Sequence, residues 1–206
     1  MIAASMGRPQ QVSLPRAIGF QVANERGDIE SLTMETSPNA SGRYLGAALI
    51  APGTYMLKLA VIDDQGRRGT VEHRFDARLR TGGPFRFGSL MLMDGRAGGP
   101  LSPKIEPRAS GASVVGYTEI YAPDAARFLE ATMTFEIAAE PNGKALAAAA
   151  GTIQETSTPG RRLALGEVPL TGLDPGEYVL RGVVSVAGRP VARLTQPFTL
   201  VGAAAR

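Results

Sequence analysis

The chain has 206 residues, of which 44% are hydrophobic, and its formal net charge is +3 at pH 7. This hydrophobic fraction is typical of a globular protein and excludes a disordered tail, while no apolar run approaches the ~20 residues that a membrane-spanning helix needs. Acidic and basic residues are interspersed along the whole chain and form no tail or stripe, which argues against a nucleic-acid-binding protein.

The absence of cysteine excludes disulfide bonds and thiolate metal ligands. The first residues, "MIAASMGRPQ", contain no basic segment and too short an apolar run for a signal peptide. We therefore expect either a cytoplasmic protein or a part of a larger one.

Period-two alternation between turn residues predicts strands throughout the N-terminal part. They are Met1–Ser5, Pro15–Ala23, Ile29–Thr36, Tyr44–Leu49, Thr54–Asp63 and Gly69–Leu79. Glycine, asparagine and aspartate mark the turns between several of them. The two glycines and the proline of "RTGGPF" predict a linker over residues 81–86, after an N-terminal β-sandwich over residues 1–80 in which a first strand could be missing.

The C-terminal part, residues 87–206, shows the same alternation. Its predicted strands are Phe87–Met93, Lys104–Arg108, Ser113–Tyr121, Thr132–Ala139, Ala145–Glu155, Arg162–Val168, Glu177–Ala187 and Val191–Leu200. Only "PDAARFLEA" is typical of a helix, of one or two turns, whereas "ALAAAAG" is predicted as a strand despite its helix propensity. We predict an all-β fold with two tandem immunoglobulin/fibronectin-III-like β-sandwich domains.

One segment occurs twice. Pro52, Gly53, Tyr55, Leu57, Val61 and Phe75 have counterparts 123 residues later in Pro175, Gly176, Tyr178, Leu180, Val184 and Phe198. In each copy a Pro-Gly turn enters a long strand, and the tyrosine two residues later shares a face with the leucine and valine. A tyrosine that opens a late strand and bonds back to the preceding loop is the tyrosine corner of immunoglobulin-like sandwiches. We interpret Tyr55 and Tyr178 as structural corners rather than catalytic acids.

The polar motifs favour structural roles over catalytic or metal-binding ones. His73 is the single histidine, on a predicted strand, and we expect it at the surface. "IDDQGRR" lacks the alternating acids and the distal glutamate of a calcium loop, and an Asp-Gly hairpin turn explains it better. Glu119 and Glu136 could face each other across adjacent strands as a glycosidase pair does, although strands place glutamates on solvent faces routinely.

Two further features bear on ligand binding. "PNGK" is not a phosphate loop, because no glycine-rich run precedes it, and the glycosylation sequon at Asn39 is of a kind that occurs by chance. A sugar-binding sandwich stacks its ligand on exposed aromatic rings. The chain has no tryptophan, and the candidates for a ligand-facing cluster are Tyr44, Tyr117 and Tyr121. Exposure of the three would favour ligand binding, and burial would favour a scaffold.

Ordered segments across nearly the whole chain resemble one family. They include "IGFQVANERGDIES", "YLGAALIAPGTYMLKLAVIDDQGRRGTVEHRFDARL", "YTEIYAPDAARFLEATMTFEIA" and "LDPGEYVLRGVVSVAGRPVARLTQPFTL". These segments are similar to the C-terminal region of bacterial secreted proteins that carry a von Willebrand factor A-related domain. In that family the metal site has the form Asp-x-Ser-x-Ser within a separate α/β domain. The motif does not occur in this sequence, so the resemblance implies no metal-binding residue here.

Residues and resemblance together suggest a non-catalytic scaffold or protein-interaction module that needs no cofactor. The resemblance implies export to the periplasm or outside the cell, and a partner that is either another protein or a neighbouring domain of the same polypeptide. The alternative is a carbohydrate- or peptide-binding module that uses its end loops. An enzyme is less favoured, because no nucleophile–base pair or metal-ligand set can be assembled from the sequence.

Overall fold

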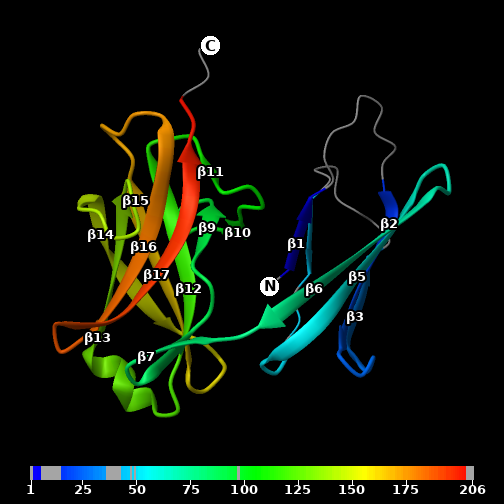
Figure 1. Ribbon diagram of the computed structural model, residues 1–206, viewed down its shortest axis with the longest axis horizontal. Coiled ribbons are helices and arrows are strands. Elements are labelled where there is room, and N and C mark those ends of the chain that lie inside the picture. The colour runs from blue at the N-terminus through cyan, green and yellow to red at the C-terminus, as the bar shows by residue number, and fades with distance from the viewer. Residues whose placement is uncertain are drawn as a thin grey trace. The chain divides into compact units, whose positions relative to one another are not determined.

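A computed structural model of the protein (Figure 1) describes residues 2–5, 15–35, 43–46, 48, 50–96 and 98–202. Strands make up most of these residues, and the helical element among them is a single 3-10 helix, η1 (Ala125–Glu130). The chain divides into two compact units, Met1–Arg78 and Leu79–Arg206. The predicted all-β fold, with β-sandwiches of the immunoglobulin/fibronectin-III type, is confirmed.

The N-terminal unit contains a four-stranded antiparallel sheet and a two-stranded one. The larger sheet has the order β3-β2-β5-β6, and β1 pairs with β4. The bounds are β1 (Ile2–Ser5), β2 (Pro15–Asn24), β3 (Ile29–Glu35), β4 (Arg43–Gly46), β5 (Gly53–Asp63) and β6 (Arg68–Ala77). Each lies within a few residues of the strand predicted for it.

The core of this unit follows from period-two alternation on its two central strands. Ile18 and Phe20 of β2 are buried, and Leu57, Leu59 and Val61 of β5 pack against them. Ile18 lies opposite Val61 and Phe20 opposite Leu59 in the β2–β5 register. Because cross-strand neighbours share a face, these side chains form one apolar layer.

The C-terminal unit is a larger sandwich whose strands follow the order β10-β9-β12-β15-β14-β13-β16-β17-β11, with the β7–β8 hairpin attached to β12 (Figure 1). The bounds are β7 (Arg80–Gly82), β8 (Phe85–Phe87), β9 (Met91–Asp94), β10 (Ser102–Pro103), β11 (Arg108–Ala109), β12 (Ser113–Tyr121), β13 (Ala131–Ala138), β14 (Ala145–Glu155), β15 (Arg161–Pro169), β16 (Gly176–Val186) and β17 (Arg189–Leu200).

Strand β14 connects the two layers of this sandwich. Its first part, up to Gly151, pairs with β13, and its last part, from Thr152, pairs with β15. The inward side chains of both layers form the main core, which includes Phe135, Ile137, Val168, Leu180 and Phe198. A second apolar cluster around Met93, Val115 and Tyr117 lies on the other face of β12.

The linker predicted over residues 81–86 is not a linker in the structure. The stretch predicted as a linker is the turn and flanks of the β7–β8 hairpin, and the boundary between the units falls earlier, after Arg78. Phe85 and Phe87 are fully buried in the main core, which a solvated linker would not allow. The glycines serve close packing: a Cβ on Gly82 would lie 2.6 Å from the Cβ of Ala192.

Smaller differences concern three other segments. The strand predicted over Phe87–Met93 is interrupted between β8 and β9, and Lys104–Arg108 is mostly outside strands. The alanine-rich stretch is a strand as predicted, because tertiary pairing with β13 outweighs its helix propensity. The predicted helix is the single 3-10 helix η1, whose N-terminus is capped by the Asp124 carboxylate accepting from the amide of Ala126.

In the described part of the chain, no helix has the length and apolar character needed to cross a membrane.

Candidate functional site

The first repeated tyrosine lies where the Pro-Gly turn enters β5. Tyr55 is 5% exposed, and its hydroxyl donates to the carbonyl oxygen of Ala51 at 2.7 Å. Gly53 leaves room for the ring, since a Cβ at that position would lie 3.2 Å from a ring carbon of Tyr55. Pro52, in the turn, is exposed. The Tyr55 ring stacks on Phe75 of β6 at a centroid distance of 5.8 Å. This is the geometry of a tyrosine corner.

The second copy has the same hydrogen bond in a more open setting. The Tyr178 hydroxyl donates to the carbonyl oxygen of Asp174 at 2.8 Å, and its ring lies 6.0 Å from that of Phe198. Tyr178 is only half-buried, in contrast to the buried ring of Tyr55. Pro175 and Gly176 form the turn as in the first copy, with Gly176 the first residue of β16.

The densest polar cluster is on the outer face of β12 and β15. The Glu119 carboxylate accepts from the Tyr117 hydroxyl at 3.0 Å and, on its other oxygen, from the Tyr121 hydroxyl. The Arg161 guanidinium also donates to Glu119. Alternation places the three β12 side chains on one face, and the antiparallel register sets Arg161 opposite Tyr121. Tyr117 is 7% exposed, and Tyr121 is half-buried.

This arrangement separates the protonation states of its members. Burial alone would raise the pKa of Glu119, but the hydrogen bonds from Tyr121 and Arg161, with the charge of Arg161, outweigh burial and lower it. Burial, together with the negative Glu119, raises the pKa of Tyr117 and of Tyr121 to about 12. At neutral pH the cluster therefore holds one carboxylate, one guanidinium and two neutral phenols. None of these four groups changes its protonation state near neutral pH.

The three tyrosines predicted to face a ligand belong to two different units. Tyr117 and Tyr121 are held by Glu119 in the C-terminal unit. Tyr44 belongs to β4 of the N-terminal unit, and its side chain lies outside the described residues, as does Asn39. Tyrosines with satisfied hydroxyls and rings packed on the sheet present little stacking surface for a sugar ring.

A second ion pair, more deeply buried, is on the opposite layer. Arg181 of β16 is 3% exposed, and it contacts Glu136 of β13 at 2.6 Å. The same guanidinium donates to the carbonyl oxygen of Gly143 at 2.6 Å, which ties the β13–β14 loop to the sheet. Glu119 and Glu136 are thus each paired with an arginine, and β15 and β14 separate their strands. The expectation that they could face each other across adjacent strands is wrong.

The remaining polar motifs are accounted for locally. Asp63 of "IDDQGRR" accepts from the amides of Gln65 and Arg67 at 3.0 and 2.8 Å, which makes the motif a hairpin turn. His73 is exposed on β6, as predicted. Among the residues that the structure describes, no three histidine, aspartate or glutamate side chains are grouped so that they could hold a metal ion.

The C-terminal unit also contains an open pocket of about 810 Å³, which was not predicted from the sequence. Its walls come from η1, the first half of β13, the last half of β14 and Arg162 of β15. Arg162 stacks 5.0 Å from the Phe128 ring centroid and contacts Glu155 at 2.7 Å, while Leu129 at the rim is 88% exposed. The pocket exists because β14 leaves β13 at Gly151, so no local sequence pattern signals it.

The arginines of both ion pairs were also missed. Arg161 begins β15 next to Arg162, and Arg181 lies between Leu180 and Gly182 in β16. Sequence alternation alone does not distinguish an outward arginine in water from one that is covered by a loop. One signal in the sequence could have found them: a glutamate and an arginine on the same face of two neighbouring strands form a cross-strand ion pair.

Comparisons with known proteins yield structural likeness only. No family model matches the chain, and no curated protein matches it. Among solved structures, fibronectin(III)-like modules of CbhA from Clostridium thermocellum share 10% identity over 97% of this chain and 85% of that chain, with a TM-score of 0.30. A tetra-tandem repeat from the extending region of a large adhesion protein shares 14% identity over 91% of this chain, with a TM-score of 0.30.

The major pilin subunit BcpA of Bacillus cereus shares 7% identity over 92% of this chain and 65% of that chain, with a TM-score of 0.24. The chain spans 42% of the adhesion-protein chain.

Proposed function

We propose that this chain is a non-catalytic β-sandwich scaffold or protein-interaction module, and that it forms the C-terminal part of a larger exported bacterial protein. The observation that carries the proposal is the Glu119 cluster. A general acid or base needs a free proton site with a pKa near the working pH. Glu119 instead accepts from two tyrosines and an arginine, has a lowered pKa, and is committed to holding β12 and β15 together.

The repeated tyrosines support the same proposal. Each hydroxyl donates to a backbone carbonyl of its own preceding turn, a bond that stabilises the loop and leaves no proton for a substrate. Each ring packs on a phenylalanine of the next strand. In both copies the residues shared between the repeats thus carry packing and turn geometry.

A panel of chromogenic ester, phosphate and glycoside substrates tests the absence of catalysis. The wild-type protein and Glu119→Gln should both give the rate of buffer alone, with Glu106→Gln as an exposed control. Turnover by the wild type that is lost in Glu119→Gln and retained in Glu106→Gln, with all three proteins folded, would contradict the proposal.

Membership in the C-terminal region of von Willebrand factor A-related secreted proteins is part of the proposal, and it is supported by the sequence resemblance described above. Sequencing the DNA upstream of the codon for Met1 tests it. An in-frame signal peptide and an Asp-x-Ser-x-Ser motif are expected. An in-frame stop codon directly before a ribosome-binding site would overturn this placement.

A second candidate function is the binding of an extended peptide, and the pocket between β13 and β14 favours it. The β13–β14 ladder ends at the pair Met133–Gly151. Beyond this pair, the start of β13 and the end of β14 are not paired with each other. Unpaired strand edges accept a peptide backbone. The one aromatic ring in the pocket wall, Phe128, is already covered by Arg162, so a sugar has no exposed ring to stack on.

Fluorescence anisotropy with a labelled Thr-Val-Ala-Thr-Val-Ala peptide tests this candidate. Binding is expected to be lost in Leu129→Lys, which places a charge at the rim, and retained in Leu146→Lys, a substitution at an exposed leucine at the other end of β14. Equal binding by both variants, or none by the wild type, would argue against a peptide site in this pocket.

A further inference from the structure

Strand β6 presents a long edge that is unpaired among the described residues. It is the outermost strand of the order β3-β2-β5-β6, and its ten residues pair with β5 along one edge without a register shift. Along the other edge it pairs with no strand in the part of the chain that the structure describes. Such a row of unpaired amide and carbonyl groups is a template for another strand.

The edge lacks two of the usual devices that prevent pairing. Proteins protect edge strands with proline, with bulges or with charged side chains. Residues 68–77 contain no proline and no bulge, and their charges alternate in sign along one face: Arg68, Glu72, Arg74 and Asp76. On the other face Val71 is 60% exposed, although it lies opposite Leu59 of the apolar layer.

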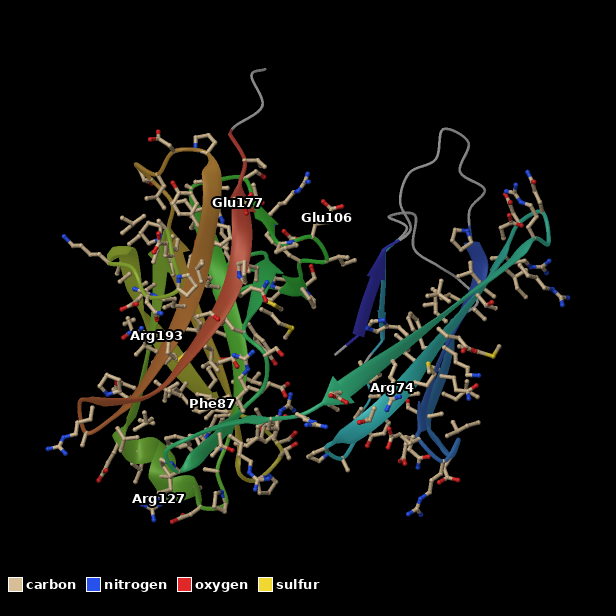
Figure 2. The ribbon with its side chains drawn as sticks, viewed as in Figure 1. Arg74, Phe87, Glu106, Arg127, Glu177 and Arg193 are labelled. Atoms are coloured by element: carbon tan, nitrogen blue, oxygen red, sulfur yellow. The ribbon has the colours of Figure 1, made fainter. Side chains whose placement is uncertain are left out.

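We propose that β6 pairs antiparallel with β6 of a second copy of this chain, about a two-fold axis that passes through His73. In this register Glu72 lies opposite Arg74 of the second copy, and by symmetry Arg74 lies opposite Glu72. Val71 lies opposite Phe75, which joins the apolar layers of the two sheets. Thr70 lies opposite Asp76, a hydroxyl beside a carboxylate. Figure 2 shows Arg74 projecting from β6.

Neighbouring registers are less favourable. A shift of two residues in one direction sets Glu72 against Glu72, and in the other direction it sets Arg74 against Arg74 and Glu72 against Asp76. Like charges directly opposite each other destabilise a strand pair. A shift of one residue turns the apolar face of one copy toward the polar side of the other. The sequence of β6 therefore selects one self-complementary register.

The existing ion pairs of these side chains are compatible with the pairing. Glu72 contacts Lys58 at 3.0 Å, and Arg74 contacts Glu25 at 2.5 Å, but all four side chains are about half exposed or more. Exposed pairs of this kind contribute little stability, so either charge can be shared with a second partner. Lys58 lies on β5 and Glu25 in the turn after β2, both on the side of β6 away from the free edge.

Disulfide trapping tests the proposal, because the chain has no cysteine and each introduced thiol is unique. His73→Cys should form a disulfide-linked dimer under mild oxidation, since residues opposite each other in a strand pair have Cα atoms within disulfide range. Gly69→Cys, on the same face and edge, should stay monomeric on denaturing gels, because the two copies of residue 69 would be about 27 Å apart at ~3.4 Å per residue.

A mixture of two variants tests the register. Thr70→Cys and Asp76→Cys should each fail to cross-link alone, and the two mixed together should give the heterodimer. Light scattering provides an independent measure: the wild type should be a dimer, and Val71→Lys, which adds a charge at an exposed position, should be a monomer that keeps the circular dichroism spectrum of the wild type.

Three outcomes would overturn the proposal. They are a wild-type monomer at high concentration, equal cross-linking of His73→Cys and Gly69→Cys, and cross-linking of Thr33→Cys on the β3 edge in place of His73→Cys. The inference deepens the proposed interaction role by naming a partner. Its failure would leave the scaffold proposal standing, because the substrate panel tests that proposal separately and does not depend on the oligomeric state.

Discussion

At the scale of single residues, the packing of one phenylalanine depends on three glycines. Phe135 of β13 is 0% exposed, and its ring lies over Gly116, Gly151 and Gly166 of three other strands. A Cβ on these glycines would approach the ring to 2.4, 2.7 and 2.2 Å respectively. The Phe135 ring therefore occupies the space that a side chain at any of these three glycines would need.

Gly166→Ala should destabilise the C-terminal unit by about 1–3 kcal/mol, because the added methyl overlaps the fully packed Phe135 ring. Gly69→Ala is the matched control: it is also a strand glycine, but a Cβ there meets nothing within 4 Å. The control should be neutral or slightly stabilising, since alanine is less costly to order than glycine. Urea unfolding of both variants measures the difference, and equal midpoints would refute the packing argument.

The phenols beside Glu119 predict a loss of stability at high pH. The pKa of Tyr117 and Tyr121 is raised from 10.0 to about 12 by burial and by Glu119. Because the folded state holds these protons more tightly than the unfolded state, their contribution is fully present below pH 10 and is lost as the pH rises toward 12. The melting temperature should fall across this interval.

The double variant Tyr117→Phe, Tyr121→Phe should show a smaller fall of the melting temperature between pH 10 and 12 than the wild type. Tyr178→Phe is the control, because its hydroxyl bonds to a backbone carbonyl and not to Glu119. Melting curves at closely spaced pH values measure the slopes. A double variant with the wild-type slope would show that other groups cause the alkaline loss.

At the scale of elements, the β7–β8 hairpin determines where the C-terminal unit begins. Phe85 packs against Phe87 and against Phe128 of η1 at centroid distances of 6.1 and 5.4 Å. The chain then continues beside β12, where the amide of Gly88 donates to the carbonyl oxygen of Glu119 at 2.9 Å. Figure 2 shows Phe87 within this unit. The hairpin is thus a part of the sandwich.

Phe87→Ala should therefore destabilise the C-terminal unit by about 3–5 kcal/mol, the cost of removing a fully buried phenylalanine. Arg86→Ala, at the exposed position next to it, should change stability by less than about 0.5 kcal/mol. Thermal unfolding followed by circular dichroism compares the two. If Phe87→Ala melted like the wild type, residues 81–86 would behave as the linker that the sequence predicted.

At the scale of the whole molecule, each apolar cluster belongs to one unit. The cluster around Ile18 and Phe20 is made of residues before Arg78, and the clusters around Phe135 and Tyr117 are made of residues after it. Each unit also has its own tyrosine corner. Cores of this kind should unfold separately.

Tyr55→Phe and Tyr178→Phe test this separation. Tyr55→Phe removes the hydrogen bond of a buried ring and should destabilise the N-terminal unit by about 1–3 kcal/mol. Tyr178→Phe, at a half-buried ring, should cost the C-terminal unit about 1 kcal/mol. Hydrogen exchange of β5 and β16 amides in each variant measures the two units independently. Loss of protection in both units from either single substitution would show one cooperative core.

The sequence by itself determined the strands, the turns and the two tyrosine corners of this protein. Alternation with period two, Pro-Gly turns and the repeat of Tyr55 at Tyr178 are local signals, and local signals are sufficient where neighbouring residues make the structure. The tertiary structure alone decided that Gly82 and Gly83 belong to a packed hairpin, that Gly116 and Gly166 make room for Phe135, and that Glu119 is held by Arg161. A glycine that permits a turn and a glycine that permits close packing look the same in sequence, because what distinguishes them is an atom contributed by a strand far along the chain.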